Sequence, residues 1–153
     1  MKYFICFSLF LFISTLNIYS QEHSLYDSTL AGRLGGDDYG MKSYIFVILK
    51  TGTNTNIEKS MRDSIFKEHL NNITRLADAG KLVLAGPFGK NVNSYRGLYI
   101  FNTTSMDEAV ELVSTDPAVK SDLLAAEYYN WYGSAALMDV TSQHKKIQKK
   151  NFK

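Results

Sequence analysis

Apolar residues in the middle of the chain follow a helical pattern and then a strand pattern. Between residues 66 and 77 they recur at the spacing of one helical face, and His69 is the one polar ring within that stripe. Gly80 then offers the positive φ with which many helices end. The apolar run 82–85, closed by Gly86 and Pro87, predicts a buried strand.

The same pattern predicts the remaining elements. Strands are expected at 44–49, 81–85, 95–101 and 124–132, and helices at 24–34, 57–79 and from residue 105, where a capping box starts. Asp116 and Pro117 open a further helical turn as N-cap and first helical residue. The order β-α-β-β-α-β predicts an α+β, ferredoxin-like domain over 41–136, with an antiparallel sheet and both helices on one face.

The two central strands are apolar at every position, in the runs 45–49 and 98–101. An antiparallel sheet with one face in water should instead alternate between apolar and polar residues. Both faces therefore need a cover, and the predicted helices supply only one. We expect a second copy of the sheet to supply the other, which gives a homodimeric α/β barrel with twofold symmetry. The N-terminal extension 21–40, with its short helix, is a competing and shorter cover.

The first twenty residues have the pattern of a secretory signal peptide. Lys2 precedes an apolar run that ends at Ile18, and Ser20 is a small residue before the expected cleavage at Gln21. The alternative is a membrane anchor, but the run is short for a span and contains polar residues. We therefore expect an exported protein, periplasmic or extracellular, with no stable membrane anchor after removal of the signal.

Composition excludes several classes of function for the mature chain. The only cysteine, Cys6, lies in the signal run, so we expect no disulfide, thiolate nucleophile or cysteine metal site. The formal net charge is +2, and the folded part has no basic stripe for nucleic acid. We expect the basic segment 137–153 to be a solvated tail, with weak contact to an anionic surface as the alternative. Without a phosphate loop, a nucleophilic serine motif or a metal-ligand cluster, the sequence predicts neither cofactor nor metal.

Several of these segments, taken in order, resemble the YCII-related (YciI-like) family over residues 41–133. The matching pieces are Tyr44–Leu49, the helix with His69 and Leu70, Gly80-Lys81-Leu82, Ala85-Gly86-Pro87, the helix start Met106–Ala109, Asp116-Pro117, and Glu127 with Trp131. The resemblance implies a dimeric ferredoxin-like barrel with a small-molecule pocket between sheet and helices. It also implies an active-site pair, a helix histidine with the aspartate of an Asp-Pro step, which corresponds to His69 and Asp116. Related barrels carry cofactor-free isomerases, lyases and monooxygenases.

His69 and Asp116 are the candidate catalytic residues. A histidine on a helix can transfer protons near neutral pH, and a carboxylate at one ring nitrogen fixes the tautomer and leaves the other nitrogen for a substrate. The alternative for His69 is a core histidine bonded to a backbone carbonyl. The alternative for Asp116 is helix capping, although one carboxylate oxygen can cap while the other holds the histidine.

Arg62 and the turn Gly86, Pro87 and Phe88 are candidate ligand-binding residues. Arg62 lies seven residues before His69, on the same helical face, and could hold an anionic group; a surface arginine that snorkels is the alternative. The turn exposes backbone N–H groups that could bind a ligand, or it is a plain turn.

Tyr129 and Trp131 complete the candidate site. Strand alternation sends both to one face, where they could line a pocket for a flat ligand or simply fill a core. The sequence thus leaves two functions open. One is an exported, cofactor-free enzyme of lyase or isomerase type that acts on a small aromatic or carbonyl-bearing compound. The other is a non-catalytic dimeric module that binds a small molecule.

Overall fold

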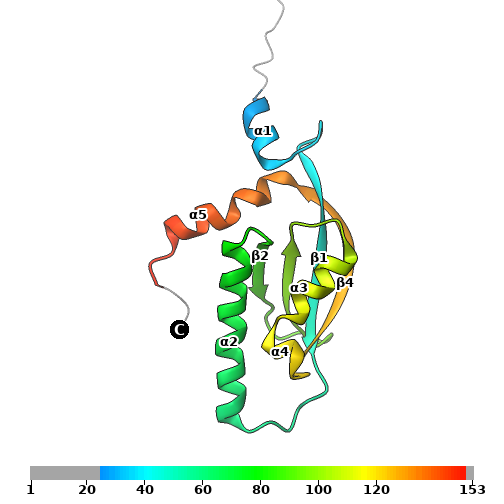
Figure 1. The fold of residues 1–153 in the computed structure, drawn as a ribbon, viewed down its shortest axis with the longest axis vertical. Coiled ribbons are helices and arrows are strands. Elements are labelled where there is room, and N and C mark those ends of the chain that lie inside the picture. Colours follow the sequence, from blue (N-terminus) through cyan, green and yellow to red (C-terminus); the bar gives the residue numbers. More distant parts are fainter. Residues whose placement is uncertain (1–24, 151–153) are drawn as a thin grey trace, which may run out of the picture.

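A computed structural model describes residues 25–150 of this chain (Figure 1). The elements in chain order are α1 (Ser28–Leu34), β1 (Met41–Thr51), α2 (Lys59–Asp78), β2 (Leu82–Pro87), β3 (Tyr95–Phe101), α3 (Met106–Ser114), α4 (Pro117–Lys120), β4 (Leu124–Ser134), a 3-10 helix η1 (Ala135–Asp139) and α5 (Val140–Ile147). The predicted strands and helices are thus all present. The predicted signal peptide lies outside the described residues.

The four strands form one antiparallel sheet in the order β2-β3-β1-β4. Strands β1 and β4 pair along their whole length, from Met41 opposite Ser134 to Thr51 opposite Leu124. Helices α2, α3 and α4 lie on one face of this sheet (Figure 1). This arrangement confirms the predicted α+β, ferredoxin-like fold.

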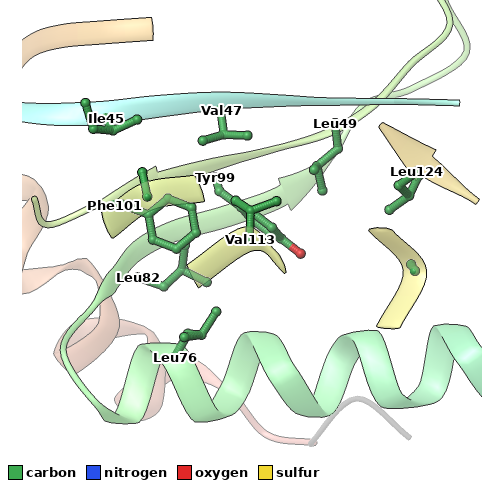
Figure 2. Packing of buried hydrophobic residues seen from close by; sticks show 11 residues of the cluster. Ile45, Val47, Leu49, Leu76, Leu82, Tyr99, Phe101, Val113 and Leu124 are labelled. Carbon is green, nitrogen blue, oxygen red and sulfur yellow. The ribbon is translucent and has the colours of Figure 1, made fainter. Parts of the chain in front are cut away.

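The main core lies between the sheet and those helices. Ile45, Val47 and Leu49 of β1 point toward the helices and are almost completely buried (Figure 2). They meet Leu76 from α2 and Val113 from α3 in one apolar cluster. Full burial of such a side chain stabilises the fold by about 1.5–3 kcal/mol. The core therefore fixes α2, which carries His69, against the helix-side face of the sheet.

Local signals set the ends of the helices. Gly80 follows α2 with φ of 68°, as its predicted place in the helix stop requires. Ser105 caps α3 by accepting from the backbone N–H of Glu108, 3.2 Å away. The returning half of the predicted capping box is replaced, because the Glu108 carboxylate accepts from Thr103 and Lys81 instead. Strand β2 continues through Pro87. Gly86 and Pro87, which were predicted to follow the strand, are therefore part of it.

The segment after β4 differs from the prediction. Instead of a solvated tail, η1 and α5 continue the fold, and Leu137 and Met138 pack against Tyr44, Val83 and Ile100 on the outer face of the sheet. The expectation that the chain has no helix left for this face was therefore wrong in part. The cover is incomplete, because Tyr129 on the same face keeps 47 % of its surface exposed.

The N-terminal helix α1 is attached to this C-terminal segment. Arg33 donates from both terminal nitrogens to the Asp139 carboxylate, at 2.9 Å each. Residues 25–40 thus contact η1 rather than forming the competing cover for the sheet. Of the helices that the structure describes, none is long and apolar enough to cross a membrane.

Candidate active site

His69 and Asp116 meet between α2 and the sheet. His69 lies in the middle of α2, and Asp116 is the N-cap of α4, 47 residues further along the chain. His69 Nδ1 lies 2.7 Å from Asp116 Oδ2 and 2.9 Å from Oδ1. Because an ionised carboxylate can only accept, we assign the ring proton to Nδ1. The contact expected between the two side chains is thus present.

Asp116 is held by the start of the helix that it caps. Its Oδ1 accepts from the backbone N–H of Ala118 at 2.9 Å, so the same carboxylate caps α4 and contacts the histidine. Asp116 is fully buried, and the His69 side chain keeps 12 % of its surface exposed. Because a buried charge without hydrogen-bond partners destabilises the fold, each donor to this carboxylate contributes to stability.

Tyr99 is a third member of this cluster, which the sequence analysis did not single out. Its hydroxyl donates to Asp116 Oδ2 at 2.8 Å and lies 3.4 Å from His69 Nδ1. The residue belongs to β3, is 1 % exposed, and points from the sheet toward the helix layer (Figure 2). Burial first, and the adjacent Asp116 charge second, raise the pKa of Tyr99. The phenol therefore stays protonated and remains a donor.

Aromatic rings hold the imidazole from two sides. Phe66, three residues earlier on α2, meets it edge-on with ring centres 5.7 Å apart and planes 80° apart. The Tyr99 ring stacks beside it, with centres 6.2 Å and planes 28° apart. Nδ1 is engaged by Asp116, whereas no residue in the range 25–150 gives His69 Nε2 a hydrogen bond. The ring is thus fixed and has one nitrogen left for a ligand.

A cavity of about 1070 Å³ lies beside this histidine. Its wall is mostly apolar and includes Phe66, Leu70, Ile73, Ala85 and Tyr99. The lining also reaches Leu84 and Leu98, which pack with the cluster on the outer face of the sheet. Helix α5 supplies another part of the wall, with His144 and Lys145 among its residues. Lys145 is paired with Asp78 of α2 at 2.7 Å. This shape and chemistry suit a small, mainly apolar molecule with a few polar groups.

Only part of the turn predicted to contact a ligand lines the cavity. Gly86 and Pro87 line the cavity, as strand residues of β2. Phe88 is not among the lining residues; it packs against Tyr95, with ring centres 6.1 Å apart. The backbone N–H of Phe88 donates to the Arg96 carbonyl, so this donor extends the sheet.

Arg62 lies apart from the cavity. Its Nη2 donates to the carbonyls of Thr55 at 3.1 Å and Ile57 at 3.4 Å, in the loop before α2. These carbonyls are within reach because Arg62 sits in the first turn of the helix. The arginine that does line the cavity is Arg96 of β3. The alternating pattern of the strand gave no reason to place Arg96 in a site.

Tyr129 and Trp131 share a face of the sheet, as alternation predicted, but it is the outer face. Trp131 packs against Tyr44 and Phe46, with ring centres 5.7 Å and 6.2 Å away. The Tyr129 hydroxyl donates to Glu127 at 3.3 Å. The structure therefore does not bring these two aromatics together with His69.

The described residues contain no group of three or more His, Cys, Asp or Glu side chains that could hold a metal ion. The chemistry that the cluster itself offers is proton transfer. A neutral imidazole with a carboxylate on Nδ1 can take a proton at Nε2 and return it.

Comparison with known proteins identifies the family to which the chain belongs. A search of solved structures finds 5-chloro-2-hydroxyhydroquinone dehydrochlorinase from Burkholderia phenoliruptrix, solved in complex with 2,5-dihydroxybenzoquinone. The match has 22% sequence identity and a TM-score of 0.43, and covers 57% of this chain and 92% of the other. No curated protein matches the chain. The family model of the YCII-related domain matches residues 44–131, from the first core strand to Trp131, and the chain belongs to this family.

Proposed function

We propose that this protein is a small-molecule enzyme in which His69, oriented by Asp116, transfers a proton to or from a substrate bound in the cavity. One observation carries the proposal: His69 Nδ1 is engaged by a buried carboxylate at 2.7 Å, while the ring lines a cavity of about 1070 Å³. A histidine that served only to fill the core would use both ring nitrogens on protein groups, because a buried polar group without a partner is costly.

The reaction class follows from what this pair can do without help. A base next to a carbon acid removes a proton α to a carbonyl, and the imidazolium that forms returns the proton to another atom or to a leaving group. These steps give an isomerisation or a lyase-type elimination that needs no cofactor. General acid–base catalysis of this kind contributes about 10²–10⁴-fold to a rate. The apolar and aromatic wall favours an aromatic or carbonyl-bearing substrate.

Crystals soaked with a library of small aromatic acids and quinones test the site. We expect a ligand in the cavity with a polar or acidic atom within hydrogen-bond distance of His69 Nε2, about 2.7–3.2 Å. Ligands that bind only elsewhere, or a histidine with Nε2 bonded to a protein group, would overturn the assignment. A ligand that binds here but is never turned over would make the protein a binding module.

The oligomeric state and destination are part of the same proposal. A second copy on the outer face of the sheet would cover Phe46, Leu84 and Leu98, which are only partly buried in the single chain. Proteins in solution rarely leave such contiguous apolar surface uncovered. Export through the signal peptide, residues 1–20, would place this chemistry outside the cytoplasm.

A further inference from the structure

Tyr99 makes contacts that an ordinary core tyrosine would not need. It is the one residue of β3 whose side chain reaches both members of the pair, by a hydroxyl donated to Asp116 Oδ2 at 2.8 Å and a ring stacked beside the imidazole. The hydroxyl also lies 3.4 Å from His69 Nδ1. Oδ2 thus accepts from two donors, the phenol and the imidazole.

We propose that Tyr99 is a positioning residue for the His69–Asp116 pair: its hydroxyl shares Asp116 Oδ2 with the imidazole and thereby sets the strength of the Nδ1–H bond that holds the ring with Nε2 available to the cavity. The inference rests on the proposed function of His69, which it deepens. Tyr99 acts through Asp116 and needs no contact with the substrate.

The buried carboxylate of Asp116 is held by several hydrogen-bond donors at once. Asp116 has no exposed surface, and its protein donors are Ala118 N–H, Tyr99 O–H and His69 Nδ1–H. Each satisfied donor fixes the carboxylate in one rotamer, and charge-assisted bonds of this kind are stronger than neutral ones. Among residues 25–150, Asp116 and Tyr99 are the titratable side chains with a polar atom close to His69 Nδ1. The burial that raises the pKa of Tyr99 keeps it in the donor form.

Because Tyr99 and His69 share one acceptor atom, removal of the Tyr99 hydroxyl should change the strength of the His69 Nδ1–H bond in a known direction. When two donors use one acceptor atom, each bond is weaker than it would be alone, because the acceptor's charge is divided between them. Removing the Tyr99 hydroxyl should therefore strengthen the remaining His69 Nδ1–H bond to Oδ2. The proton in a stronger hydrogen bond of this kind resonates further downfield.

The experiment uses the protein from Gln21 to Lys153, labelled with ¹⁵N-histidine. The wild type is compared with the variants Tyr99→Phe and Tyr128→Phe. The first keeps the ring and loses the hydroxyl. Tyr128 is the matched control, because it packs against the same core cluster from β4 without a bond to Asp116. NMR locates the His69 Nδ1 proton and shows which nitrogen carries it, with no need for a substrate.

We expect the wild type to carry the proton on Nδ1. In Tyr99→Phe this resonance should move downfield, and in Tyr128→Phe it should stay in place. An unmoved or upfield resonance in Tyr99→Phe, an equal shift in Tyr128→Phe, or a proton on Nε2 in the wild type would each overturn the inference.

A second measurement keeps the inference open to refutation if Tyr99→Phe does not fold. In the wild type, the buried Tyr99 hydroxyl proton should be visible in slow exchange and show a nuclear Overhauser effect to the His69 Nδ1 proton. Its absence would contradict the sharing. These spectra report positioning alone, so they can fail while turnover by His69 stands, and they can succeed in a protein that turns nothing over.

Discussion

Asp116 caps helix α4 and holds His69 with one carboxylate. Its Oδ1 accepts from Ala118 N–H at 2.9 Å, and its Oδ2 lies 2.7 Å from His69 Nδ1. An Asp-Pro step is ordinary at a helix start, yet here the cap places the carboxylate against the next layer of the fold. The structural role and the proposed chemical role therefore depend on the same atoms, and substitutions can separate them.

Substitution of Asp116 should lower the free energy of unfolding, and by more for alanine than for asparagine. Asp116→Ala removes the cap and leaves two buried donors, on Tyr99 and His69, without an acceptor, so we expect a loss of about 2–4 kcal/mol in the free energy of unfolding. Asp116→Asn keeps one acceptor oxygen and should lose less. Urea unfolding of both variants measures the difference. An alanine variant as stable as the wild type would contradict the hydrogen bonds described.

Tyr99 should make the stability pH-dependent in the alkaline range. Its pKa is raised in the folded state from a usual value of 10.0, first by burial and then by Asp116. Below that usual value both states are protonated, and the contribution of Tyr99 to stability is complete. As pH rises above it, the unfolded chain ionises while the folded chain does not, so stability falls. Unfolding curves at pH 9 and pH 11 should show this loss. Tyr99→Phe should reduce the loss, whereas substitution of an exposed tyrosine, Tyr39→Phe, should not.

The outer face of the sheet should join two copies. Ile48 lies on this face, opposite Leu98 and Glu127 of the neighbouring strands, whereas Val110 is exposed on α3 in the helix layer. Light scattering of the wild type should give twice the chain mass. Ile48→Glu should reduce it to one chain, because a second carboxylate opposite Glu127 would have to be buried beside a like charge, and Val110→Glu should not. A wild type that stays monomeric at micromolar concentration would contradict the dimer.

The exported protein should lack residues 1–20. The basis is the apolar run before Ser20, and the intact mass of protein recovered outside the cytoplasm checks it. A mass that keeps these residues, found in a membrane fraction, would indicate an anchor.

Much of the fold could be predicted from the spacing of apolar residues, because the helical repeat and the strand pattern were both clear. The helical stripe around His69 and the strand 95–101 needed no tertiary information. The C-terminal helix was missed because lysines dominate the segment after residue 144, whereas the residues that attach it, Leu137 and Met138, come before them. Two apolar residues are too few for a periodic signal.

The site was predictable only in part, for geometric reasons. The family resemblance supplied His69 and Asp116, whose contact depends on the packing of α4 against α2. Tyr99 could not be found, because strand alternation gives its face and not its partner. The same limit placed Tyr129 and Trp131 together without saying on which face. Arg62 bonds to nearby loop carbonyls, a local alternative that helical spacing does not reveal.

Hydrogen exchange into candidate substrates tests the central claim most directly. Small carbonyl-bearing aromatic compounds are incubated with the protein in D₂O, and proton NMR follows the loss of the C–H signal next to the carbonyl. We expect the wild type to accelerate exchange of at least one compound. His69→Gln should reduce that rate by about 100-fold or more, while Glu68→Gln, an exposed neighbour on the same helix, should leave it within a few-fold. A His69→Gln variant that exchanges as fast as the wild type, or a wild type that binds these compounds and exchanges none, would contradict proton transfer by His69.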